Sequence, residues 1–264
     1  SSYNDSVAHF NSPIIEYILG VFMIISGGNF SLYYQVYQSG MKQLFKDTEF
    51  RTYIIFTIIS VILVTANICY VNGFSIIDGF RYAFFQVTSF VSTTGFVSYD
   101  YDQWPSFSKL LLAVMYLTGG CAGSTAGGIK ISRMVVLAKA AWSELLRILH
   151  PNIIYSIKFG HRIVEPQRVG NITRFFFLYI IVFLVLTLAI SLTGMDIMDS
   201  MGLIAACLSS VGPAFGIVGP TSTYADLSTY GRIVTIIAMI LGRLEIFTLL
   251  IIARPSFWSQ KRNW

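Results

Sequence analysis

Charged residues are scarce in this sequence, and so are cysteine and histidine. Only 12% of its 264 residues are charged, whereas a soluble domain carries about 25%, so an ordinary soluble domain is excluded. Cys69, Cys121 and Cys207 lie in or beside apolar runs without Cys-x-x-Cys spacing, and neither a disulfide framework nor a zinc site is indicated. The 55% of hydrophobic residues and the mean hydropathy of +0.66 predict an all-α polytopic membrane protein.

The missing residue types also narrow the function. His9, His150 and His161 all fall outside the apolar runs. A membrane-embedded hydrolase with Ser124 as its nucleophile would need a base at membrane depth, and the only candidate near it, Lys130, lies at the end of its span. We therefore expect no enzyme. No phosphate-binding loop follows a strand, and we expect no cofactor in this chain and no nucleic-acid partner.

The apolar runs predict the membrane topology. A spanning helix needs about 20 predominantly apolar residues. The sequence contains five candidate spans, the third interrupted at 118–128, and these are residues 13–38, 53–71, 108–141, 175–192 and 229–252. Two more runs, 78–91 and 198–208, are too short to cross, and a turn rich in small or hydroxyl residues follows each one. We expect these two runs to form re-entrant half-helices.

The order span, short run, turn, span occurs twice, at 53–141 and at 175–252, and internal repeats are typical of transport proteins. Each unit is predicted to be a span–pore loop–span hairpin. The chain then divides into four parts. The last span of a preceding hairpin with its loop takes up residues 1–50, and a hairpin with a broken second span takes up 51–141. A basic cytoplasmic connection, 142–171, leads to the final hairpin with its tail, 172–264.

The two turns are the candidate ion site. Their sequences are Ser92-Thr93-Thr94-Gly95-Phe96 and Ser210-Val211-Gly212-Pro213. Carbonyls of an extended turn can replace the hydration shell of a potassium ion, and glycine permits backbone angles that are closed to other residues. Taken alone, these residue types favour an ordinary polar turn after an amphipathic helix. The repeat is what favours a pore loop, because irregular backbone at membrane depth must line a cavity or be buried in protein.

The distribution of charge predicts the orientation. All but four of the 18 Lys and Arg residues lie on the side that holds residues 39–51, 130–174 and the tail, and the positive-inside rule places that side in the cytoplasm. Both turns then open outward, together with seven aspartates: Asp5, Asp78, Asp100, Asp102, Asp196, Asp199 and Asp226. An acidic mouth concentrates cations, but acids also gather wherever basic residues are excluded, and both interpretations stay open.

The break in the third span has two interpretations as well. It contains Gly119, Gly120, Gly123, Ser124, Thr125, Gly127 and Gly128. Glycines at every fourth position are typical of close helix packing in membranes. So many glycines, however, destabilise a continuous helix by about 1 kcal/mol each, which favours an intramembrane loop.

Arg243 lies within the last span, where a charge is costly and usually functional. Glu245 is two residues away and does not share its helix face, so a pair within the helix is not expected. A pair between helices, or snorkelling of the Arg243 side chain to the interface, stays open.

Five motifs, read in order, resemble the Trk/Ktr/HKT superfamily of potassium transporters, and in particular the bacterial Trk-type membrane subunit. They are Ser-Gly-Gly-Asn-Phe at 26–30, Ser-Thr-Thr-Gly-Phe at 92–96, Gly-Gly-Cys-Ala-Gly-Ser-Thr-Ala-Gly-Gly-Ile-Lys at 119–130, Ser-Val-Gly-Pro at 210–213 and Leu-Gly-Arg-Leu-Glu-Ile-Phe at 241–247. The third and fifth are highly specific. In that family four hairpins surround one pore, and this chain resembles the last span of the second hairpin with all of the third and fourth.

The resemblance implies a role for each motif. Potassium, the substrate, would be held by the carbonyls of Thr93, Thr94, Gly95, Ser210, Val211 and Gly212. The Gly119–Gly128 stretch, Lys130 and Arg243 would gate the pore beneath this filter. With Arg243 in the pore, Glu245 would be structural and would meet a base such as Lys130 or Arg133. The first residues lack an initiator Met and a signal pattern, and an N-terminal half of the transporter is expected before them.

The resemblance also implies the surroundings. These are the lipid bilayer of the bacterial cytoplasmic (inner) membrane, a homodimer and a cytoplasmic nucleotide-binding regulatory subunit. A sodium- or proton-coupled cation transporter of the same fold and a non-conducting structural subunit remain alternatives.

Overall fold

The structure is a computed structural model that describes residues 5–150, 156–160, 162–220, 222–244 and 246. His161, Glu245, the tail 254–264 and the expected last span beyond residue 246 lie outside the described residues. Within the described ranges the chain is helical except for loops and one antiparallel hairpin of β1 (Lys158–Phe159) and β2 (Arg162–Ile163). The predicted all-α fold is confirmed.

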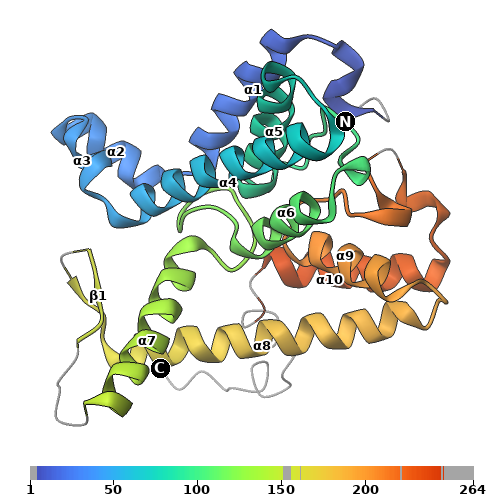
Figure 1. Ribbon diagram of the computed structural model, residues 1–264. Coiled ribbons are helices and arrows are strands. Elements are labelled where there is room, and N and C mark those ends of the chain that lie inside the picture. The colour runs from blue at the N-terminus through green and yellow to red at the C-terminus, as the bar shows by residue number, and fades with distance from the viewer. Residues whose placement is uncertain (1–4, 151–155, 161, 221, 245, 247–264) are drawn as a thin grey trace, which may run out of the picture.

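The first part of the chain runs as far as the Gly-rich stretch and the helix after it. Its elements are η1 (Ser6–Phe10), α1 (Pro13–Ser26), α2 (Phe30–Ser39), α3 (Lys42–Lys46), α4 (Thr48–Asn72), α5 (Ile76–Val91), η2 (Tyr101–Gln103), α6 (Ser106–Thr118) and α7 (Ile131–Leu149). The second part contains α8 (Pro166–Ser191), α9 (Ile197–Leu208), η3 (Gly216–Val218), η4 (Tyr224–Asp226) and α10 (Thr229–Arg243). The long helices α4 and α8 lie on opposite sides, with α6 and α9 packed between them (Figure 1).

Both half-helices form where the sequence predicts them. The α5 helix starts at Ile76, after Ser75, whose hydroxyl accepts a hydrogen bond from the Asp78 N–H at 3.1 Å. The α9 helix starts after Asp196, whose carboxylate accepts from the Met198 N–H at 3.2 Å. Side-chain oxygens at this position satisfy N–H groups that a helix start leaves unpaired.

The first candidate span, 13–38, forms as two helices. Among the described residues only α4 and α8 are by themselves long and apolar enough to cross a membrane; α1 and α2 qualify only as a pair, and they are bent by 88°. Two contacts explain the bend. Asn29 accepts from the Ser31 N–H at 2.9 Å and so starts a new helix, and the Gly27 carbonyl leaves the helical ladder to accept from Cys121 N–H at 2.8 Å.

The third span breaks as predicted, because α6 ends at Thr118 and α7 begins at Ile131. The polar connection is shorter than the expected 142–171: α7 continues to Leu149, and α8 already begins at Pro166. Pro166 suits the start of α8, because a proline at the first helical position lacks only an N–H that would be unpaired there anyway. Both α7 and α8 extend well beyond the apolar runs that the sequence marks.

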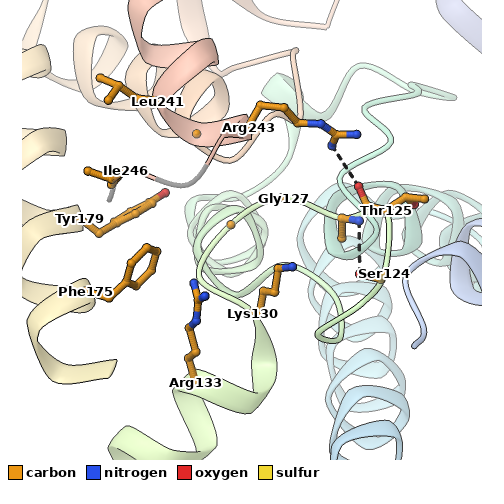
Figure 2. Close-up of a pocket in the computed structure, with 13 residues that line it drawn as sticks. Ser124, Thr125, Gly127, Lys130, Arg133, Phe175, Tyr179, Leu241, Arg243 and Ile246 are labelled. Carbon is orange, nitrogen blue, oxygen red and sulfur yellow. Dashed lines mark hydrogen bonds between the residues drawn. The ribbon is translucent and has the colours of Figure 1, made fainter. Parts of the chain in front are cut away.

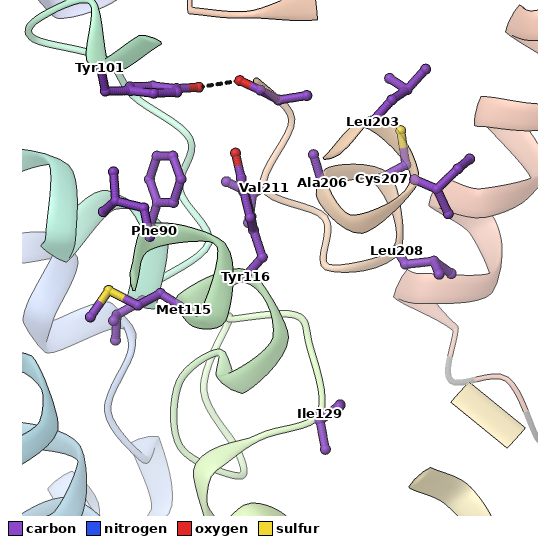
Figure 3. Packing of buried hydrophobic residues seen from close by; sticks show 14 of the residues in the cluster. Phe90, Tyr101, Met115, Tyr116, Ile129, Leu203, Ala206, Cys207, Leu208 and Val211 are labelled. Atoms are coloured by element: carbon purple, nitrogen blue, oxygen red, sulfur yellow. Dashed lines mark hydrogen bonds between the residues drawn. The ribbon is translucent and has the colours of Figure 1, made fainter. Parts of the chain in front are cut away.

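An aromatic cluster joins the two hairpins. Phe90 of α5 lies 4.6 Å from Tyr116 of α6 and 5.2 Å from Tyr101, measured between ring centroids. Phe215, which follows the second turn, lies 5.3 Å from Tyr101 and completes the cluster. Figure 3 shows Phe90, Tyr101 and Tyr116. Edge-on aromatic pairs add specific geometry to the area they bury, so this cluster fixes how the two turns lie relative to each other.

A buried ion pair joins α1 to the first half-helix. Arg81 donates to both carboxylate oxygens of Glu16, at 2.6 and 2.7 Å, and the two side chains are only 12% and 1% exposed. Taking both charges out of water is costly, and the arrangement is stable only while each charge keeps its partner.

Replacing Glu16 by Gln is therefore expected to destabilise the protein, because the Arg81 charge stays buried without its counter-charge. The expected loss in the free energy of unfolding is about 3 kcal/mol, measured by denaturant titration in detergent. The control is Glu144→Gln, which breaks the pair with Arg147 where both side chains are more than half exposed. Equal stability of the two variants would show that the buried pair contributes nothing.

Candidate functional site

The two re-entrant turns share one backbone conformation. Their residues with positive φ are Thr93, Gly95, Ser210 and Gly212, at 54°, 76°, 58° and 102°. In each turn an N–H also reaches back to the half-helix: Thr94 donates to the Ser89 carbonyl at 2.9 Å, and Val211 donates to the Ala206 carbonyl at 3.0 Å. The repeat that the sequence indicates thus extends to individual backbone hydrogen bonds.

Carbonyl oxygens of these turns are unpaired. Of the six predicted potassium ligands, five accept no hydrogen bond from any described residue, namely Thr93, Thr94, Gly95, Ser210 and Val211. The sixth, Gly212, accepts from the Tyr224 hydroxyl. Irregular backbone at membrane depth is tolerated where it lines a water-filled cavity, so a row of unpaired carbonyls on buried and half-buried residues fits a path for water or ions.

The carbonyls that follow are held by hydroxyl groups. Ser89 donates to the Phe96 carbonyl at 2.7 Å, and Tyr116 donates to the Pro213 carbonyl at 2.5 Å. Phe96 and Pro213 occupy matching places in the two turns. The hydroxyls therefore fix the outer end of each turn; among the six predicted ligands before these ends, Gly212 alone has its carbonyl paired by a described residue, Tyr224.

Both turns face one cavity of about 330 Å³. Its lining consists of Ser6, Thr94, Gly95, Phe96, Val97, Val211, Gly212, Pro213, Val218, Gly219, Pro220, Ser222 and Tyr224. None of these side chains is charged, so a cation there would meet carbonyl and hydroxyl oxygens.

The glycines of the two turns, Gly95 and Gly212, differ in their surroundings. A Cβ on Gly95 would collide with the Val211 carbonyl of the other turn, whereas a Cβ on Gly212 would meet open space. The positive φ values favour glycine at both places, but only at Gly95 does a side chain also push the two turns apart.

The Gly-rich stretch is an irregular loop that lies directly against the turns. Its Gly127 N–H donates to the Thr93 hydroxyl at 2.8 Å, and a Cβ on Gly127 would collide with the Ser209 carbonyl. Gly119, Gly123 and Gly128 have φ of 59°, 75° and 75°. The loop interpretation of this stretch is confirmed, and its small residues also serve close packing.

The same loop is anchored to the bend between α1 and α2 and to α4. Thr125 donates its hydroxyl to the Ser26 carbonyl at 3.2 Å, next to the contact between Cys121 and Gly27. The Ala122 N–H donates to the Glu49 carboxylate at 2.6 Å. Glu49 is buried, and sequence reasoning missed it. Its signal was an acid in the polar segment just ahead of an apolar run, which a solvated loop explains equally well.

Arg243 reaches the loop from α10. Its guanidinium donates to the Thr125 carbonyl at 3.1 Å (Figure 2). Together with Lys130 and Arg133 it lines a basic pocket of about 170 Å³ between the loop, α8 and the end of α10. Lys130 has a φ of 78°, and the Arg133 guanidinium lies 4.2 Å from the centre of the Phe175 ring. The structure thus brings together the predicted gating residues; the expected partner Glu245 lies outside the described residues.

Comparison with known proteins places this arrangement in a family. A family model described as "TrkH: Cation transport protein" matches residues 1–262. The Trk system potassium uptake proteins TrkH of Salmonella typhimurium and Escherichia coli are each 36% identical over 262 residues, which is 98% of this chain and 54% of theirs.

A solved structure shares the fold. The crystal structure of the potassium transporter TrkH from Vibrio parahaemolyticus superposes with a TM-score of 0.91 at 36% identity, over 98% of this chain and 56% of that one. The chain spans about half the length of the relatives it matches. The family match covers nearly every residue, from the first bent helix pair to the last helix, and the chain belongs to the TrkH family of cation transport proteins.

Proposed function

We propose that this chain forms part of a pore for potassium uptake, and that the two re-entrant turns supply part of its selectivity filter. The observation that carries the proposal is the set of five unpaired carbonyls in two turns of the same conformation. Three of these residues, Thr94, Gly95 and Val211, line one cavity whose side chains carry no charge. The names of the relatives, Trk system potassium uptake proteins, support potassium as the ion.

The half-helices support the same conclusion. Both α5 and α9 end directly at their turns, and a helix C-terminus carries a partial negative charge. Two such ends aimed toward the filter favour a cation over an anion, without any acidic side chain in the cavity lining.

The Gly-rich loop and Arg243 act as one gate beneath the filter. The loop touches the filter at Thr93 and accepts a hydrogen bond from Arg243 at Thr125. A loop across the path obstructs it sterically, while a fixed positive charge repels a passing cation; in a low-dielectric pore this repulsion amounts to several kcal/mol before water screens it.

The transporter works in the bacterial cytoplasmic membrane as a homodimer with a cytoplasmic nucleotide-binding subunit. These partners follow from the family resemblance. Support comes from the basic residues of α7, the β-hairpin and the start of α8, namely Lys139, Arg147, Lys158, Arg162 and Arg168. Anionic lipid headgroups also attract such clusters.

Serine at either filter glycine should weaken the preference for potassium over sodium in the full-length transporter. The cause is a changed carbonyl geometry, and the larger effect is expected for Gly95→Ser because its Cβ collides with Val211. The measurement is rubidium against sodium uptake at matched expression. Gly73→Ser is the control, since Gly73 also has a positive φ but nothing within 4 Å of its Cβ position. An unchanged ratio in both filter variants would contradict the filter assignment.

Loss of the gate should raise uptake. Arg243→Ala and a shortened 120–127 loop should each increase rubidium uptake without a partner's signal. Together they should give less than the product of the separate effects, because both remove the same obstruction. Arg243→Lys, which keeps the charge, is the control. If the increase in the double variant equals the product of the two single increases, the two sites act independently and a shared gate is refuted. If Arg243→Ala lowers uptake and folds poorly, Arg243 has a structural role instead.

The docking face has its own test. Reversing the charge of Arg147, Arg162 and Arg168 together should abolish co-purification of the regulatory subunit with the transporter. Reversal of Lys42 and Lys46, basic residues of α3, controls for a general loss of positive charge. Co-purification that survives the triple reversal would count against this face.

A further inference from the structure

Each filter turn is held at its outer end by a short helix of the preceding hairpin. In the first turn, the residue that the short helix holds is Val97. Its carbonyl accepts from the N–H groups of Val7 and Ala8 at 3.0 and 3.1 Å, and its N–H donates to the Ser6 hydroxyl at 3.2 Å. All three partners belong to η1, which precedes α1.

The second turn repeats the arrangement with different chemistry. Ala214 follows Ser210 by as many residues as Val97 follows Thr93. Its carbonyl accepts from the buried Tyr101 hydroxyl at 2.7 Å (Figure 3). Beyond it, the Gly216 N–H donates to the Asp102 carboxylate at 3.1 Å. Tyr101 and Asp102 belong to η2, which precedes α6 just as η1 precedes α1. Two backbone N–H groups and one serine hydroxyl hold the first turn, whereas the side chains of a tyrosine and an aspartate hold the second.

We propose that Asp102, together with Tyr101, is a positioning residue for the second filter turn and thereby sets its preference among cations. This inference rests on the proposed function of the turns. Tyr116 fixes Pro213, Tyr101 fixes Ala214, and Asp102 fixes Gly216. The three contacts together define the outer exit of the strand whose inner carbonyls face the cavity. Asp102 is the one residue of the three that has a carboxyl group.

The Asp102 carboxylate is half-buried, and burial, the largest effect, raises its pKa above that of a free aspartate. The hydrogen bond from the Gly216 N–H and the charge of Lys109 on α6 lower the pKa, while the charges of Asp100 and of Asp199 on α9 raise it further. The segment 214–219 contains no charged residue. A carboxylate accepts a stronger hydrogen bond than a protonated carboxyl group does. The contact with Gly216 is therefore strongest above the raised pKa and weakens as the outer pH falls through it.

The test uses the full-length transporter at matched expression and measures the ratio of rubidium to sodium uptake at neutral and at acid external pH. In the wild type the ratio should fall on acidification. In Asp102→Asn it should already be lower at neutral pH, by about threefold or more given the loss of a charged hydrogen bond, and it should no longer change with pH. Asp5→Asn is the control, because Asp5 is exposed on η1 and its side chain does not cap that helix; its ratio and pH dependence should match the wild type.

A ratio in Asp102→Asn that equals the wild type at both pH values overturns the inference. If that variant does not reach the membrane, Tyr101→Phe decides, because it removes only the hydroxyl that holds Ala214; an unchanged ratio there overturns the inference as well. A wild type that takes up rubidium no better than sodium overturns the proposed filter itself, whereas selective wild-type uptake with an unaffected Asp102→Asn overturns only the positioning role.

Discussion

Backbone N–H and C=O groups in the hydrocarbon region have no water to bond to, and outside a helix they must be paired by other parts of the protein or line a water-filled cavity. This chain leaves the helical conformation at the bend near Gly27, at the two turns and along the Gly-rich loop. These stretches pair largely with one another. Cys121 donates to Gly27, Gly127 donates to Thr93, and Arg243 donates to Thr125. Each irregular segment is therefore stable only in the presence of the others, and the helices are arranged to bring them together.

The same requirement explains which parts of the fold could be predicted from the sequence. The half-helices and the loop have local signals, because a short apolar run and a cluster of glycines are visible within a dozen residues. The bend at 27–29 has a local signal in Gly27 and Gly28, but close helix packing is the commoner use of such glycines. The deciding contact, the bond from Cys121, comes from far along the chain.

The charged contacts could not be predicted in the same way. Glu16 and Arg81 are 65 positions apart, and Glu49 is 73 positions from Ala122. Nothing in the sequence pairs them. An acid inside an apolar run, as Glu16 is, marks a costly charge that needs a partner, but the pattern does not identify that partner. The positions of the loops of the site could therefore be predicted from the sequence, but the side chains that hold these loops in place could not.

The repeat is close in backbone and unequal in side chains, and this inequality matters for the filter. Ser89 holds Phe96 within its own hairpin. The matching residue of α9 is Ala206, which has no hydroxyl, and Tyr116 of the other hairpin holds Pro213 instead. The second turn thus depends on the first hairpin for its shape, while the first turn depends on η1. A change in one hairpin is passed on to the turn of the next.

The filter and the loop beneath it also share a bond. Thr93 has a positive φ, an uncommon conformation for a residue other than glycine, and its hydroxyl accepts from Gly127. If the loop moves away, Thr93 loses this partner on the inner side, while Ser89 still holds Phe96 on the outer side. The consequence is local: the carbonyls between Thr93 and Phe96 gain freedom at one end only. Under the proposed filter and gate roles, a loop that clears the path would also relax the inner end of the first turn, and passage and selectivity would change together through one hydrogen bond.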